Sequence, residues 1–164
     1  MTTRTRFLSR WDEAGYLQDK VIRWLYGRTP SGPRARLFAD RLERTLKEIK
    51  PGRQAIKAVE CQALIAEARG DLRSAIRHRR REIALLTRLL ALPEYADGAP
   101  GLDTDHSDVV DRFILLALLL RRDGQLSEAA AALDNGRSIA SKHGFRFHGA
   151  ALVKEIRAAA RAAG

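Results

Sequence analysis

Apolar residues recur along most of the chain at steps of three and four, which is the period of an amphipathic α-helix. Seven segments show this pattern, and glycine and proline residues stand between them. The strict alternation of a half-buried β-strand is absent from the sequence. The expected helices cover about residues 5–27, 33–50, 53–69, 71–92, 107–122, 125–142 and 148–162. The pattern therefore predicts an all-α protein of about seven helices.

Two of these segments show more than a simple core stripe. The helix at 107–122 is apolar nearly all round, which predicts the most buried position. The first helix turns Trp11 and Trp24 toward a core, but it carries further large side chains on its other sides. Exposed aromatic residues beside arginines are typical of protein interfaces. The side chains left for another surface are Leu8, Tyr16, Leu25 and Tyr26.

Two stretches of the chain resemble each other at a distance of 54 residues. The segment ALIAEARGDLRSAI (63–76) aligns with ALLLRRDGQLSEAA (117–130). Small residues let two helices approach closely, and a glycine makes the tight turn between them, so the pair predicts a repeated helix–turn–helix. The aligned positions are Ala63 with Ala117, Gly70 with Gly124, Leu72 with Leu126, and Ala75 with Ala129.

The repeat resembles the tetratricopeptide family. The second copy meets the family pattern at Phe113, Leu116, Ala117, Leu120, Gly124, Leu126, Ala129 and Leu133. The first copy matches at Val59, Ala63, Ala66, Gly70, Leu72, Ala75 and Ile76, but Gln62 and Arg79 stand where apolar residues are usual. The long spacing and the loop containing Asp105, His106, Asp108 and Val109 are similar to the kinesin-light-chain type of repeat, with Ser107 in place of a proline.

The resemblance implies a short α-solenoid of antiparallel helix pairs. Residues 1–52 would form a basic N-terminal helical pair, 53–144 two repeat units with a long loop at 93–106, and 145–164 a capping helix. It implies a non-enzymatic protein–protein interaction module or assembly adaptor, whose partner is a peptide or helix of another protein or a second copy of the chain. Position by position, the partner groove would be lined by Lys57, Glu60, Leu64, Glu67, Asp111, Ile114, Leu118, Arg121 and Arg122.

The net charge of +10 introduces an alternative. Residues 1–60 carry 14 Lys and Arg against 7 Asp and Glu, whereas residues 102–164 carry 9 against 8. A basic surface attracts nucleic acid, anionic lipid or acidic protein.

The helix at 71–92 carries a stripe of arginines on its outward side. This stripe could follow a phosphate backbone or be only a solvated face, and it has no aromatic residues between the arginines on which bases could stack. Its members are Arg73, Arg77, Arg80, Arg81 and Arg88. The alternative function is therefore an RNA- or DNA-binding accessory protein that uses this stripe and the basic N-terminal third.

Arg79 does not belong to that stripe. On a helical wheel it lies inside the apolar sector, among Leu72, Ile76 and Ile83. Because an unpaired buried guanidinium costs several kcal/mol, Arg79 must form an ion pair or lie at an interface. The expected partner is Glu82, one turn further on, or Glu67.

Other candidate chemistry is weaker. Asp103, Asp105, His106 and Asp108 could hold a divalent cation, but the glycine and the terminal glutamate of an EF-hand are missing. Helix capping by Asp105 or Ser107 explains the same residues.

The pairs Arg73/His78 and Arg137/His143 formally fit the arginine–histidine spacing of helical ribonucleases. Their side chains point ~140° and ~120° apart on a regular helix, which argues against an active site.

The remaining expectations concern cofactors and cell location. No cofactor or metal is expected, and Cys61, the only cysteine, is read as a packed side chain. The N-terminus has no apolar signal-peptide region, and the longest apolar run, Phe113–Leu120, is far short of the ~20 residues that span a bilayer. The sequence therefore predicts a cytoplasmic protein without a membrane segment.

Overall fold

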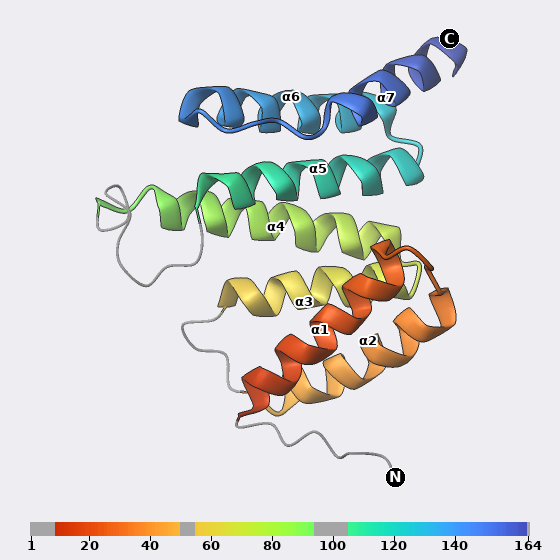
Figure 1. Cartoon of the computed structure of the whole chain (residues 1–164), viewed down its shortest axis with the longest axis vertical. Helices are drawn as coiled ribbons and strands as arrows, with labels where there is room; N and C mark the ends of the chain where they lie inside the picture. The colour runs from red at the N-terminus through yellow and green to blue at the C-terminus, as the bar shows by residue number, and fades with distance from the viewer. Residues whose placement is uncertain (1–8, 50–54, 94–104, 164) are drawn as a thin grey trace. The chain divides into compact units, whose positions relative to one another are not determined.

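The computed structural model describes residues 9–49, 55–93 and 105–163, and within them all regular secondary structure is α-helical. The seven helices are α1 (Arg10–Tyr26), α2 (Gly32–Lys47), α3 (Ala55–Ala68), α4 (Leu72–Leu90), α5 (His106–Arg122), α6 (Leu126–His143) and α7 (Ala150–Ala163) (Figure 1). Each expected helix is present, with ends shifted by a few residues. The predicted all-α class is confirmed, and within each of the chain's two compact units neighbouring helices pack together, α1 with α2, α2 with α3, α5 with α6 and α6 with α7.

The helix ends follow from local chemistry. The side chain of Ser9 accepts a hydrogen bond from the backbone amide of Asp12 at 3.1 Å and so caps α1. Pro33 lies in the first turn of α2, where its missing amide donor costs nothing. Asp105 caps α5 by accepting from the Ser107 amide at 2.7 Å, while the Asp108 carboxylate accepts from the Asp105 amide at 2.9 Å. The acidic loop residues that could have held a metal thus complete a capping box.

The turn between α3 and α4 and the turn between α5 and α6 have the same hydrogen bonds. The amide of Asp71 donates to the Ala66 carbonyl, and that of Gln125 to the Leu120 carbonyl, both at 2.9 Å. Gly70 and Gly124 both have φ of +78°, a left-handed conformation that favours glycine. Every donor and acceptor of one turn corresponds to that of the other at the 54-residue offset, so both turns are Schellman motifs of one kind.

The chain forms two compact units, Met1–Ala75 and Ile76–Gly164. The division falls within α4, whereas the sequence placed its boundaries at 52/53 and 144/145. In the first unit α1 packs on α2 and α3, and α2 packs on α3. In the second unit α6 packs on both α5 and α7.

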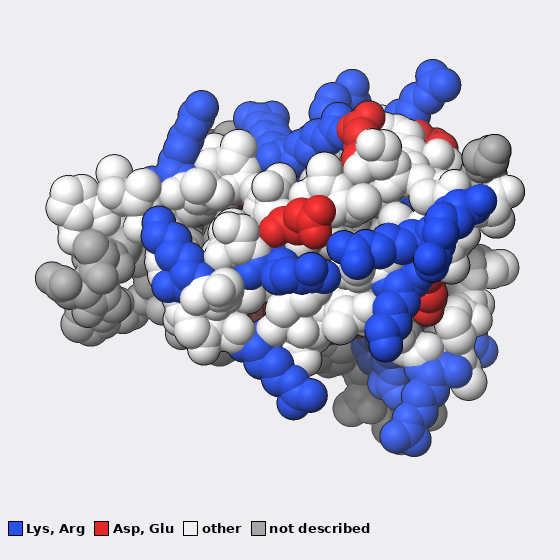
Figure 2. Space-filling model, turned by 90° about the horizontal axis from the view of Figure 1, so that it is seen from above, with Lys and Arg blue, Asp and Glu red and all other residues white. Residues whose placement is uncertain are grey.

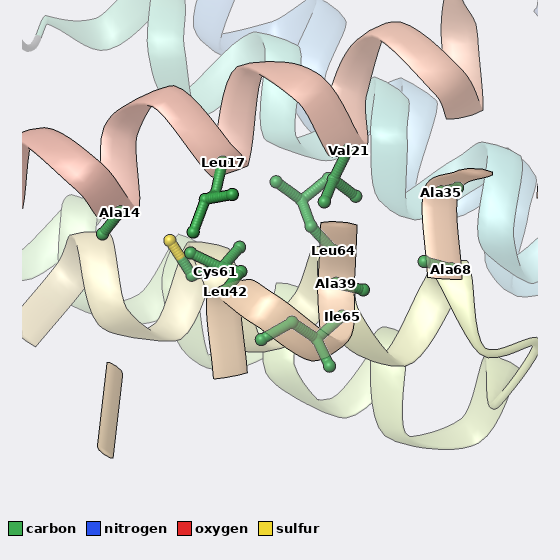
Figure 3. Close-up of a cluster of buried hydrophobic side chains, with 10 residues drawn as sticks. All are labelled: Ala14, Leu17, Val21, Ala35, Ala39, Leu42, Cys61, Leu64, Ile65 and Ala68. Carbon is green, nitrogen blue, oxygen red and sulfur yellow. The ribbon is translucent and has the colours of Figure 1, made fainter. Parts of the chain in front are cut away.

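Small and branched apolar side chains fill the core of the first unit. Leu17 of α1, Leu42 of α2 and Cys61 of α3 are 1%, 0% and 0% exposed and belong to one cluster (Figure 3). Alanines from all three helices lie between them and bring the backbones close together. Cys61 is a packed side chain, as the sequence predicted. The other members of the cluster are Ala14, Val21, Ala35, Ala39, Leu64, Ile65 and Ala68.

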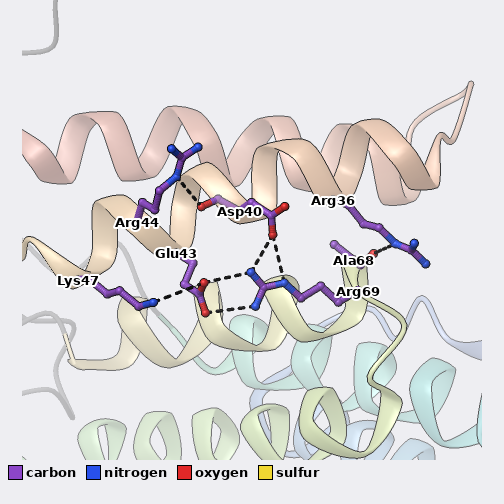
Figure 4. Close-up of polar contacts among 7 residues, drawn as sticks. All are labelled: Arg36, Asp40, Glu43, Arg44, Lys47, Ala68 and Arg69. Carbon is purple, nitrogen blue, oxygen red and sulfur yellow. Dashed lines mark hydrogen bonds and ion pairs between the residues drawn. The ribbon is translucent and has the colours of Figure 1, made fainter.

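At the surface of this unit, one arginine ties α3 to α2. The guanidinium of Arg69 lies 2.7 Å from Asp40 and 3.0 Å from Glu43, two carboxylates one turn apart on α2 (Figure 4). Nearby, Arg36 donates to the backbone carbonyl of Ala68 at 3.3 Å. These bonds fix the end of α3 against α2.

Candidate functional site

The α3 half of the predicted groove faces α1. Leu64 is 2% exposed and belongs to the core cluster that α1 shares. Glu67 is 3% exposed, and both of its carboxylate oxygens lie 2.5 Å from the Tyr26 hydroxyl, which donates to it. Lys57 and Glu60 are half-buried. A partner that approaches this unit therefore reaches Lys57 and Glu60 on α3, whereas Leu64 and Glu67 already contact the chain's own first helix.

The side chain of Lys57 on α3 reaches α1 near Gly15. A Cβ atom at this position would lie 3.4 Å from the Lys57 ammonium nitrogen. Toward the other end of α1, Tyr26 contacts Glu67. These two contacts place α1 along the α3 face from which the groove was predicted, so that α1 forms one wall beside Lys57 and Glu60.

Three large side chains on the outer sides of α1 are exposed. Tyr16, Ile22 and Tyr26 are 38%, 36% and 42% exposed, while the core side chains of the same helix are at most 1% exposed, apart from Gln18. The Lys20 ammonium lies over the Tyr16 ring, 5.0 Å from its centroid. The sequence predicted that Tyr16 and Tyr26 would lie at another surface, but it missed Ile22. The position of Ile22, one helical turn before Tyr26 and outside the core stripe, could have indicated its exposure. Leu25 packs against the core cluster, and Leu8 lies outside the described residues.

The α5 half of the predicted groove lies in the second unit. Asp111, Arg121 and Arg122 are exposed, and Ile114 and Leu118 are half-buried. Arg121 forms an ion pair with Glu155 of α7. This face therefore offers a short apolar strip with charged residues on either side, as the sequence predicted for these positions.

Arg79 is paired as the helical wheel predicted. Its Nη1 atom lies 2.5 Å from Glu82 Oε2, and the two side chains are 1% and 0% exposed. The sequence missed a second arginine: Arg112 Nε of α5 lies 2.6 Å from Glu82 Oε1. The Arg79 Nε atom is buried without a hydrogen-bond partner among the described residues. One carboxylate thus holds two guanidinium groups, and this cluster links α4 to α5 within the second unit.

The five arginines of the α4 stripe are all exposed. Arg80 pairs with Glu128 of α6, although both side chains remain about half exposed. The stripe predicted from the wheel is therefore a solvent-facing surface. Its members are Arg73, Arg77, Arg80, Arg81 and Arg88.

The Arg137 and His143 side chains contact different aromatic rings. The Arg137 guanidinium lies over the Phe147 ring, 5.5 Å from its centroid, while the His143 ring stacks on His106. Arg73 is exposed and His78 half-buried on α4. Each side chain of the Arg137/His143 pair thus has a separate partner.

The acidic loop gives no metal centre among the residues that the structure covers. Within residues 9–49, 55–93 and 105–163, no three His, Cys, Asp or Glu side chains are placed to hold a metal ion. Asp105 is a helix cap whose pKa is lowered, first by the hydrogen bond from Ser107. Asp103 lies outside the described residues. In the same ranges, no helix combines the length and apolar character needed to cross a lipid bilayer.

Comparison with the models of known protein families, with curated proteins and with solved structures found no match to this chain. We therefore infer the function from the repeated turn, from the exposed side chains of α1 and from the distribution of charge.

Proposed function

We propose that the protein is a non-enzymatic interaction module that binds a segment of another protein along α1 and the adjoining side of α3. The observation that carries the proposal is the exposure of Tyr16, Ile22 and Tyr26 on a helix whose opposite face fills the core. Tyr16 and Ile22 lie outside the core cluster of their unit, and Tyr26 also donates to the buried Glu67. Tyrosine is enriched among the few residues that contribute most of the binding energy in protein interfaces.

The charged residues beside this surface favour a peptide or helix over a phosphate backbone. Lys57 and Glu60 of α3, both half-buried, offer one cation and one carboxylate, and the Lys57 ammonium lies near Gly15 of α1. A carboxylate on the binding surface repels phosphate, whereas a mixed pair is complementary to a mixed-charge protein segment. The surface therefore combines an apolar centre with polar sides, which is the usual anatomy of a protein interface.

The repeated turn supports the type of scaffold. Two Schellman turns with matching bonds, 54 residues apart, are what a duplicated helix–turn–helix produces. Tetratricopeptide-like repeats, which the sequence resembles, present the first helix of each unit to partners.

The test compares two variants in affinity purification after nuclease treatment. Tyr16→Ser with Ile22→Asn removes two exposed apolar side chains of α1, and Leu92→Ser removes an exposed leucine, 42% accessible, after α4. We expect the unaltered protein and Leu92→Ser to retain the same discrete partner or dimer, and the α1 double variant to lose it. Retention by all three proteins would contradict the proposal. Circular dichroism checks that each variant keeps its helix content.

The second candidate is binding of RNA or DNA through the α4 stripe. The observation that favours it is the exposure of all five arginines on one helix. Such contacts lose affinity steeply between ~50 and ~200 mM salt because each neutralised phosphate releases counterions. Replacement of Arg77, Arg81 and Arg88 by glutamine should then weaken binding and reduce the salt dependence. Unchanged affinity would remove this candidate.

A further inference from the structure

In the C-terminal part of the chain, basic residues outnumber acidic residues over α6, α7 and the segment between them taken together. Over residues 102–164 basic and acidic residues nearly balance, but Gln125–Gly164 carries six Lys and Arg against three Asp and Glu. The balancing carboxylates Asp105, Asp108, Asp111 and Asp123 lie on α5 or at its ends. Helices α6 and α7 and the segment between them therefore carry a basic excess that the balanced count over residues 102–164 conceals. The six basic side chains, all exposed, are Arg137, Lys142, Arg146, Lys154, Arg157 and Arg161.

Two of the three carboxylates on this surface are already neutralised. Glu128 pairs with Arg80 of α4, and Glu155 pairs with Arg121 of α5. Both arginines come from neighbouring helices of the same unit, so the six basic residues of α6, α7 and the segment between them keep their charge. Figure 2, which views the molecule from above, shows lysine and arginine side chains projecting from much of the visible surface and only small acidic patches.

Helix α7 concentrates three of these charges on one side. Lys154, Arg157 and Arg161 lie within about 60° of each other on a regular helix and span ~10 Å along its axis. The opposite face carries Leu152 and Ile156, which are 8% and 1% exposed. The helix thus uses its apolar face for its own unit and presents its basic face outward.

The surface between the charges is shallow. On α7 the exposed neighbours of the cations are alanines, among them Ala150 and Ala158, and on α6 they include Ser138 and Ser141. Small side chains allow a backbone to approach until several cations reach it at once. Arg137 is held in place because its guanidinium lies over the Phe147 ring.

We infer that the outer faces of α6 and α7 form a contact surface for the phosphate backbone of double-stranded nucleic acid. Each exposed cation neutralises a phosphate, and the release of counterions supplies the affinity. The contacts read no bases, so binding is independent of sequence. This surface meets the α4 stripe at the Arg80–Glu128 pair, and the inference does not depend on protein binding by α1.

The side chains on this surface favour nucleic acid over the other polyanions. A membrane-bound amphipathic helix inserts large apolar side chains, but Leu152, Val153 and Ile156 of α7 are buried in the protein. An acidic protein partner would need a well-packed apolar centre, and the exposed positions here are alanine, serine and charged residues. Single-stranded nucleic acid binds by stacking on exposed aromatic rings, whereas Phe145 and Phe147 are half-buried.

The experiment measures fluorescence anisotropy of labelled 20-base-pair DNA and RNA duplexes with the full chain, from about 50 to about 200 mM salt. Lys154→Gln/Arg157→Gln/Arg161→Gln removes the α7 charges, and Arg77→Gln/Arg81→Gln/Arg88→Gln removes the same net charge from α4. We expect duplex binding at ~50 mM salt and an affinity loss of at least about tenfold in the α7 variant. The slope of log K against log salt should fall by about 2 to 3, as for three lost phosphate contacts. The α4 variant should change less in both quantities.

Four outcomes would overturn the inference. The first is that the unaltered protein does not bind the duplexes at ~50 mM salt, and the second is that the two triple variants lose equal affinity for them. The third is that only the α4 variant loses affinity. The fourth is that the unaltered protein binds polyglutamate of matched charge as tightly as it binds the duplexes. The third would favour the α4 stripe as the nucleic-acid site. Helix content by circular dichroism ensures that a loss of binding does not arise from unfolding. None of these four outcomes bears on the capture of a protein partner by α1, because that capture is measured after nuclease treatment.

Discussion

The imidazole rings of His106 and His143 stack face to face, with centroids 3.7 Å apart and planes inclined by 12°. His106 is the first residue of α5, and His143 is the last residue of α6. The stack therefore joins the beginning of one helix to the end of the next. Burial lowers the pKa of His106, and the neighbouring His143 and Lys142 lower it further, against the opposite effect of the Asp105 carboxylate.

This stack predicts a loss of stability on acidification. Because folding lowers the pKa of His106, the unfolded chain binds its proton more readily. The stabilisation is complete above the ordinary value of 6.5 and decreases as the pH falls toward the lowered pKa of the folded state. Urea unfolding between about pH 7 and pH 5 should show the decrease.

Two variants separate His106 from the other histidines. His106→Gln should flatten the dependence on pH, whereas His148→Gln, at an exposed residue outside the stack, should keep it. The lowered pKa values of Asp105 and Glu43 act at lower pH, because their ordinary values are 3.8 and 4.5. A stability that is constant over this range in the unaltered protein would contradict the prediction.

The buried Glu82 should be the most sensitive polar position of the second unit. Glu82→Gln removes the charge that holds Arg79 and Arg112, and it should lower the free energy of unfolding by about 3–5 kcal/mol. Arg112→Gln should cost less, because the Arg112 side chain is 19% exposed and Glu82 keeps its bond to Arg79. The double change Arg79→Met/Glu82→Leu should recover most of the loss, since it leaves no unpaired charge at either position. Urea unfolding of the three variants gives the comparison, and a loss below about 1 kcal/mol for Glu82→Gln would contradict it.

The local sequence pattern was sufficient to predict the helices and to identify Arg79 as a buried charge. It did not predict contacts between residues that are far apart in the chain. Period and capping residues depend on neighbours within a few positions, so the seven helices followed from spacing. The Asp105 cap and the Arg79–Glu82 pair were each one of the alternatives that spacing offered. Arg112 is 30 residues from Glu82, and no periodicity marks it as the second partner.

The candidate surfaces show the same limit. The groove was assigned by position within a repeat, and nothing in that position indicates that Tyr26 of α1 contacts Glu67 of α3, 41 residues away. The charge count placed the basic excess in the N-terminal third. The basic excess of α6 and α7 is present in the count over residues 125–164, but it is concealed when the aspartates in and around α5 are counted with it.

The two repeated turns should respond alike to substitution. Gly70→Ala and Gly124→Ala each force an alanine into φ near +78°, with no neighbouring atom within 4 Å to add a clash. The cost is the left-handed backbone alone, about 1–2 kcal/mol at each site. Gly32→Ala, also without neighbours within 4 Å but with no left-handed φ, should change stability little. Unequal losses at Gly70 and Gly124 in urea unfolding would argue against equivalent turns.

The Arg69 cluster allows electrostatic and packing effects to be separated. Arg69→Ala removes the bonds to Asp40 and Glu43, and because the arginine is 38% exposed we expect a loss of about 1 kcal/mol at low salt. In ~1 M salt, where the Debye length is ~3 Å, the loss should be smaller. Arg44→Ala is the matched control, because Arg44 is exposed on α2 and bonds only the Asp40 backbone carbonyl among the contacts drawn in Figure 4.

A second readout follows the Glu43 carboxyl directly. Its pKa is held below 4.5, first by the hydrogen bond from Arg69, so the stabilisation exists above pH 4.5 and is lost as the pH falls through the lowered pKa. NMR titration should therefore show a higher Glu43 pKa in Arg69→Ala than in the unaltered protein, and no change in Arg44→Ala. Arg69→Lys keeps the charge but not the planar pair of donors, so its Glu43 pKa should lie between the other two. An unchanged Glu43 pKa in Arg69→Ala would show that this ion pair does not persist in solution.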